Sequence, residues 1–114
     1  MKRRYYKVPD PIQLDLPGAK DVALRVIFGK EDGAPNFTMF FFEIAPGGHG
    51  PYHNHPWEEA IFIKSGYADV ISDYKTTSIG PGTALFLAPG EPHQFVNIGA
   101  EPLEFLSILP HKVL

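Results

Sequence analysis

Apolar residues along this chain gather in short runs, each of which ends at glycine, proline or another turn-forming residue. No helical period is sustained for ten residues. The runs are rich in Val, Ile, Phe and Thr, which favours strands over helices. They are Val22–Phe28, Phe37–Ile44, Ala60–Ile63, Tyr67–Ile71, Thr83–Leu87, Phe95–Ile98 and Leu103–Leu109. Short strands separated by frequent turns predict an all-β fold, a small antiparallel β-barrel or sandwich.

The length of the chain suits one domain, and we predict a single domain over residues 1–114. Residues 1–20 contain Pro9, Pro11, Pro17 and Gly18, so we expect an N-terminal arm or an edge segment there. No internal repeat is present. At this size a hydrophobic core can form without disulfide bonds.

The run from Phe37 to Ile44 is apolar on both faces of the strand it predicts. Because side chains alternate across a strand, Phe37, Met39 and Phe41 share one face while Phe40 and Phe42 share the other. A barrel formed by one chain needs only one apolar face, so either the N-terminal segment or a second subunit has to cover the spare aromatic rings. We predict a homodimer; a large core covered within one chain is the alternative.

Composition and charge exclude several classes of protein. The chain has no cysteine, which excludes disulfide frameworks, thiolate metal sites and cysteine nucleophiles. The formal net charge of −3 and the isolated basic run Lys2–Arg4 do not suit a nucleic-acid binder. The longest strongly apolar stretch is too short to span a bilayer. No apolar segment follows the basic run, so we do not expect a signal peptide. We therefore expect a soluble, cytoplasmic protein with no nucleic-acid or membrane partner.

Three histidines and a glutamate are candidates for a functional site. His53 and His55 are two positions apart, so both imidazoles face the same side of an extended segment. Glu59 opens the run that continues inward with Ile61, and a carboxylate on an apolar face needs a partner or a metal ion. His93 begins a later strand and shares its face with an aromatic residue. A metal site is the economical explanation, and a surface cluster without metal is the alternative.

At these residues the sequence resembles the cupin family, whose first motif reads G-x5-H-x-H-x3,4-E-x6-G. Every spacing of that motif is matched over residues 47–66, from Gly47 to Gly66. The second motif, G-x5-P-x-G-x2-H-x3-N, is matched over residues 82–97 except that Ala88 replaces the proline. The resemblance implies a double-stranded β-helix, or jelly roll, in which His53, His55, Glu59 and His93 bind one divalent metal ion.

The donor types agree with that implication. Imidazole and carboxylate without thiolate suit Mn, Fe, Co, Ni, Cu or Zn, and the resemblance extends to compact cupins that bind manganese. Some of those place a histidine where this chain has Glu59, so reactivity tied to an all-histidine site does not carry over. Because the ligands bind metal only when deprotonated, we expect the affinity to fall as the pH drops through roughly 6–7.

Apolar residues near the ligands are candidates for a substrate pocket. Met39, Phe41 and Phe95 are expected in the pocket wall, with ordinary core packing as the alternative. Trp57 follows Pro56 between two ligand segments, where it would wall the pocket or cap the rim of the barrel.

Three functions remain open. We favour a metalloenzyme of dioxygenase type acting on a small organic molecule, a preference that rests on analogy between folds. A non-catalytic protein that binds a sugar or metabolite is the first alternative. A metal-dependent lyase or isomerase is the second.

Overall fold

The computed structural model describes residues 1–111, and the strands predicted from the sequence are present in it, with two more. The elements are β1 (Ile12–Gln13), β2 (Lys20–Phe28), the 3-10 helix η1 (Lys30–Asp32), β3 (Phe37–His49), β4 (Glu59–Ser65), β5 (Ala68–Ser72), β6 (Lys75–Ile79), β7 (Ala84–Leu87), β8 (Gln94–Asn97) and β9 (Leu103–Pro110). The sequence did not predict β1 or β6. Both are exposed, and β6 reads K-T-T-S-I, which has no apolar run.

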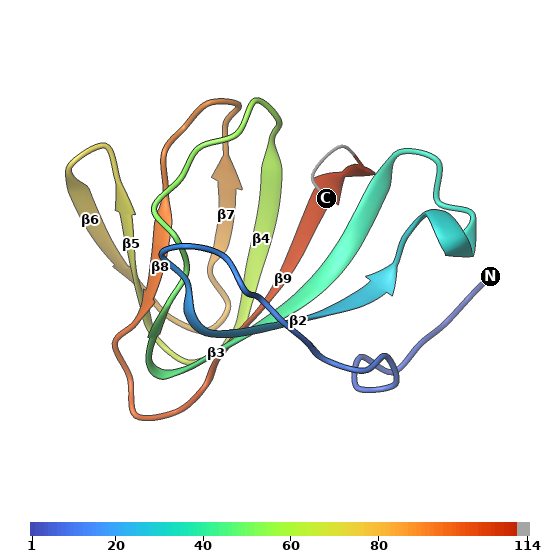
Figure 1. Ribbon diagram of the computed structural model, residues 1–114, viewed down its shortest axis with the longest axis horizontal. Coiled ribbons are helices and arrows are strands. Elements are labelled where there is room, and N and C mark those ends of the chain that lie inside the picture. Colours follow the sequence, from blue (N-terminus) through green and yellow to red (C-terminus); the bar gives the residue numbers. More distant parts are fainter. Residues whose placement is uncertain (112–114) are drawn as a thin grey trace.

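The strands form one antiparallel sheet that curls into an open barrel. Its order is β6-β5-β8-β3-β9-β4-β7, with β2 also paired to β3 and β1 paired to β2. Figure 1 shows β5, β6 and β8 toward one side of the molecule and β2, β3 and β9 toward the other, with β4 and β7 between them in this view. The predicted all-β fold is therefore confirmed.

Strand β3 connects the two halves of the sheet. Its residues 37–44 pair with β9, whereas His49 at its end pairs with Val96 of β8. Between these parts the chain bends at Gly47, which has a φ of +80°, and at Gly48, where an added Cβ would lie 2.6 Å from the carbonyl oxygen of Lys20. Glycine is needed here because a side chain would clash with β2 or adopt a strained backbone.

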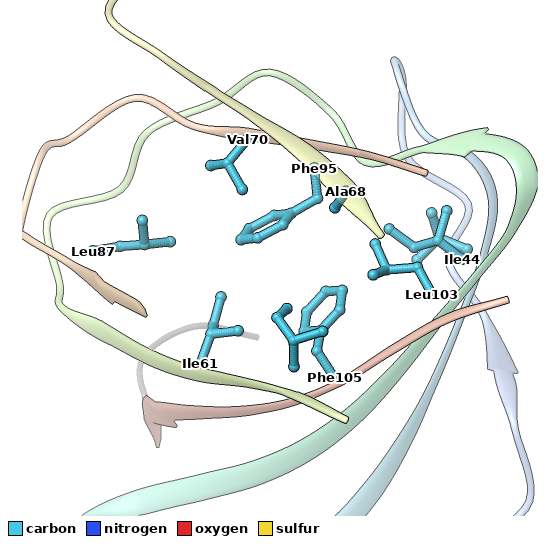
Figure 2. Packing of buried hydrophobic residues seen from close by; sticks show 10 residues of the cluster. Ile44, Ile61, Ala68, Val70, Leu87, Phe95, Leu103 and Phe105 are labelled. Carbon is cyan, nitrogen blue, oxygen red and sulfur yellow. The ribbon is translucent and has the colours of Figure 1, made fainter. Parts of the chain in front are cut away.

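The core fills the space between the two halves. Figure 2 shows Ile61, Val70, Phe95 and Phe105 pointing from different strands toward a common centre. The rings of Phe95 and Phe105 stack with centroids 5.1 Å apart. Each such side chain stabilises the fold by roughly 1.5–3 kcal/mol through burial. The core thus holds together the strands that carry the candidate site.

The N-terminal arm lies against the outside of β2 and β3. The ring of Tyr6 packs on that of Phe41, with centroids 4.5 Å apart. Arg25 on β2 donates hydrogen bonds to the carbonyl oxygens of Lys7 and Pro9.

Within residues 1–111, no helix is long and apolar enough to cross a membrane.

Candidate metal centre

A short antiparallel ladder outside the named strands brings the histidines together. His53 and His93 exchange two backbone hydrogen bonds, with N···O distances of 3.1 and 2.8 Å. The same ladder continues to Gly50 and Phe95 on one side, and to His55 and Gly90 on the other. Residues paired in this way project their side chains from the same face, and His55 joins them because it lies two positions from His53.

The three imidazoles converge. One ring nitrogen of each of His53, His55 and His93 lies within 4.8 Å of the others. Nitrogens that share one ion at about 2.1 Å lie at most about 4.2 Å apart, so small ring rotations complete such a cluster. Three histidines close enough to bind one metal ion are therefore present.

Backbone carbonyls orient two of the rings. Nδ1 of His55 lies 2.8 Å from the carbonyl oxygen of Trp57, and Nδ1 of His93 lies 2.9 Å from that of Glu91. A carbonyl oxygen only accepts hydrogen bonds, so each Nδ1 carries the hydrogen. The Nε2 atom of each neutral ring then has a free lone pair, the form in which histidine binds a metal.

Glu59 approaches two of these free lone pairs. Its Oε1 lies 3.3 Å from Nε2 of His55 and 3.7 Å from Nε2 of His93. The side chain begins the inward face of β4 and is only 7% exposed. Lone pairs on nitrogen and on a carboxylate repel each other at such distances unless a cation, either a proton or a metal ion, lies between them. Geometry and burial therefore favour a cation at this point.

The electrostatics of His53 also suit a metal ligand. Partial desolvation, followed by the neighbouring His93 and His55, holds the pKa of His53 below its usual value, although the residue is still open to solvent. The lowered pKa favours the neutral ring, which is the form that binds a metal ion. Three imidazole nitrogens, with a carboxylate oxygen beside two of them, suit a first-row divalent ion and do not select one of them.

These side chains form part of the wall of a cavity of about 360 Å³. Apart from the ligands, the wall is largely apolar. It is lined by Leu14, Leu16, Val22, Leu24, Phe40, Phe42, Ile44, Gly50, Pro51, His53, Asn54, His55, Pro56, Trp57, Glu59, His93, Phe95, Phe105 and Leu109.

Trp57 and Phe95 lie in this wall, where the sequence placed them, and the Trp57 ring stacks on His55 with centroids 5.1 Å apart. Met39 and Phe41, also expected in a pocket wall, are not among the residues that line this cavity. They occupy the outer face of β3, and Phe40 and Phe42 face inward instead. The reason is that Phe41 shares its face with exposed Glu43.

Sequence reasoning also missed three residues at the site. Leu14 and Leu16 belong to the proline-rich N-terminal segment, which carries no strong strand pattern. Ser107 is fully buried in β9, and its Oγ donates a 2.6 Å hydrogen bond to Oε2 of Glu59. The serine could have been found, because it interrupts the alternating apolar face of L-E-F-L-S-I-L.

Comparison with known proteins agrees with the fold and the motifs. The family model for the cupin domain matches residues 40–109. No curated protein matches the chain in sequence.

Solved structures share the fold over most of the chain. The polyketide cyclase RemF from Streptomyces resistomycificus is 34% identical, with a TM-score of 0.90 over 96% of this chain and 79% of its own. A cupin 2 domain-containing protein from Halorhodospira halophila is 30% identical, with a TM-score of 0.72 over 76% of this chain and 62% of its own. A predicted oxalate decarboxylase from Thermotoga maritima is 24% identical, with a TM-score of 0.83 over 93% and 96% of the two chains.

Proposed function

Because the chain belongs to the cupin family, we propose that it is a metal-dependent enzyme acting on a small, largely apolar organic molecule. His53, His55, Glu59 and His93 hold one divalent ion. The observation that carries this proposal is the convergence of three histidines, two of them beside a buried carboxylate, in the wall of an apolar cavity. An ion held there would act as a Lewis acid on a substrate oxygen or exchange electrons with it.

The cavity favours a substrate with an apolar carbon skeleton and oxygen atoms at one end. Besides the four ligands, the polar side chains in its wall are Asn54 and the indole of Trp57. A small dianion such as oxalate would lack a charged side chain to neutralise the end remote from the ion. Rings such as those of Phe42 and Phe95 suit a substrate that itself contains a ring.

Ring closure is the first candidate reaction, supported by the 34% identity to RemF over nearly the whole chain. In such a reaction a nucleophilic carbon attacks a carbonyl carbon, and the proton it loses passes to the carbonyl oxygen. No oxidant is consumed. The protein would bind the substrate in a folded shape and exclude water from it.

Oxidation of dioxygenase type is the second candidate. It is supported by the donor set, because imidazole and carboxylate also suit redox-active iron and manganese.

Products formed with and without oxygen separate these candidates. The metal-loaded protein would be incubated with an aryl-substituted β-polyketone under air and under nitrogen. The molecular masses of the products would then be measured by mass spectrometry. Ring closure predicts a product of unchanged mass, or lighter by one water, in both atmospheres. A product that needs air and gains two oxygen atoms supports the dioxygenase. Ligand-induced thermal stabilisation without any product would contradict an enzymatic role and indicate a binding protein.

We also propose that the chain forms a homodimer through the outside of its sheet. The outer apolar face comprises Met39, Ala60, Phe62, Ala84, Phe86, Leu106 and Ile108, from four adjacent strands. Phe62 and Phe86 are 49% and 64% exposed. The N-terminal arm packs on Phe41 and leaves these two rings uncovered.

The pattern of large and small residues on this face favours a second copy of the chain as its cover. Phe62 lies opposite Ala84 in the register of β4 and β7, and Ala60 lies opposite Phe86. Rings therefore alternate with hollows on the same surface. A two-fold axis can set the rings of one copy over the alanines of the other, because such interfaces are self-complementary.

A further inference from the structure

Ser107 is a polar residue in an apolar place. The inward face of β9 otherwise carries Leu103, Phe105 and Leu109, all of them buried. Ser107 has no exposed surface, and among the buried side chains of residues 1–111 it carries the only hydroxyl. Burying an unpaired hydroxyl is costly, so this one is expected to have a specific partner.

That partner is the carboxylate of Glu59. The hydroxyl of Ser107 donates to Oε2 at 2.6 Å, the short distance typical of a hydrogen bond to a charged acceptor. The other oxygen, Oε1, faces Nε2 of His55 and of His93. The two carboxylate oxygens therefore have different environments, one held by the sheet and one turned to the histidines.

We infer that Ser107 is a positioning residue that makes Glu59 a ligand through Oε1 alone. The inference rests on the proposed metal site. Rotation of the carboxylate toward the ion would bring Oε2 into contact with it, but would break the hydrogen bond to Ser107. Without the hydroxyl, Oε2 would be left unpaired in an apolar surrounding. The ion would then be its nearest available partner, and the carboxylate would turn to present both oxygens.

This arrangement matters for substrate binding. A carboxylate that binds through two oxygens occupies one more position on the ion than a carboxylate that binds through one. By engaging Oε2, Ser107 keeps that position available for a substrate oxygen. A residue that touches neither substrate nor metal would thus set how many sites the substrate can use.

Cobalt(II) provides a test that does not depend on activity. The purified full chain, freed of metal, would be titrated with Co²⁺, and both the affinity and the visible absorption spectrum recorded. We expect Ser107→Ala to bind Co²⁺ about tenfold more weakly than the wild type, because the ligand has lost its support. We also expect weaker visible absorption, because the extra carboxylate oxygen raises the coordination number.

Two variants serve as controls. Ile61→Val removes a methyl group from the residue paired with Ser107 across β4 and β9, so it loosens packing while leaving the hydrogen bond intact. Ser65→Ala removes a serine hydroxyl that donates to Glu104 instead, at 3.1 Å. Both should retain the wild-type spectrum and affinity.

The results separate two kinds of failure. If the wild type binds Co²⁺ and Ser107→Ala matches it in spectrum and affinity, the serine only fills space and the inference is wrong. The same holds if Ile61→Val produces the same spectral change. If the wild type itself binds no Co²⁺, the proposed metal site fails and this inference fails with it.

Discussion

Two of the candidate ligands are oriented by backbone atoms only two residues away. His55 donates from Nδ1 to the carbonyl oxygen of Trp57, and His93 donates in the same way to that of Glu91. These contacts arise in turns that contain Pro56 and Pro92, which restrict the backbone next to each ring. Ring orientation is therefore encoded locally, and the ladder between the two segments only has to bring the rings together.

Adjacent glutamates offer a matched test of the carboxylate. Glu59→Gln keeps the shape of the side chain but loses its charge, so we expect the affinity for Zn²⁺ to fall by about tenfold or more. Glu58→Gln changes an exposed neighbour and should bind like the wild type. Isothermal titration calorimetry on the metal-free proteins measures both. Equal losses in the two variants would mean that general charge, and not a ligand, had been removed.

The sequence identified the residues that have a distinctive spacing. It did not identify those whose location depends on which face of a strand points inward. The convergence of His53, His55 and His93 was anticipated from their spacing and from the motif resemblance, and Glu59 lies beside two of them. The phase of β3 was harder, because five of its first six residues are apolar or aromatic. Glu43 was the informative residue, since a charge at that position turns Phe41 outward with it.

At the scale of elements, two turns depend on glycine for different reasons. Gly66, between β4 and β5, has a φ of +87°, and an added Cβ would lie 2.6 Å from the carbonyl oxygen of Pro102. Gly82, before β7, has a similar φ of +85° but no atom within 4 Å of an added Cβ. The first position thus combines backbone strain with a clash against the chain entering β9, and the second has strain alone.

Alanine substitutions should separate these contributions. We expect Gly82→Ala to lower the free energy of unfolding by about 1–2 kcal/mol, the cost of a left-handed backbone. Gly66→Ala should lower it by at least about 1 kcal/mol more, because backbone atoms of a neighbouring strand have to move. Urea denaturation of the two variants and the wild type gives the comparison. A smaller loss for Gly66→Ala than for Gly82→Ala would contradict the packing described for this turn.

Strands that lack apolar residues could not be predicted from the chain. β6 is defined by its pairing with β5 across a tight turn, where Asp73 and Tyr74 have positive φ values of 50° and 66°. That conformation favours glycine, asparagine or aspartate, and Tyr74 is none of these, so the turn signal in the sequence is weak. β1 has only two residues and exists through its pairing with β2.

At the scale of the whole molecule, the cavity needs both halves of the sheet and the N-terminal segment. Phe95 of β8 comes from one half and Phe40 of β3 from the other, while Leu14 and Leu16 belong to the segment before β2. These parts are far apart in sequence, so apolar character alone could not show which of them share a cavity. The sequence was enough to predict a barrel with a hydrophobic core, but not which residues line its cavity.

If the chain forms the proposed homodimer, substitutions of two exposed aromatic residues should differ in their effect on the oligomeric state. Phe62→Asp places a charge in the middle of the outer apolar face and should convert a dimer to a monomer. Tyr74→Asp changes a fully exposed ring in the turn between β5 and β6 and should leave the dimer intact. Light scattering after size-exclusion chromatography measures the mass of each. A monomeric wild type at tens of micromolar would refute the dimer, as would a dimeric Phe62→Asp.

Metal content measured on protein purified without added metal tests the central claim most directly. We predict about one divalent transition-metal ion per chain in the wild type and less than about a tenth of that in His93→Ala, because the histidine lost is a ligand at the centre of the cluster. His111→Ala removes a histidine that bonds to Thr38, away from the cluster, and should retain the ion. A wild type that neither carries metal nor takes it up on addition, or a His93→Ala variant with full content, would contradict the account.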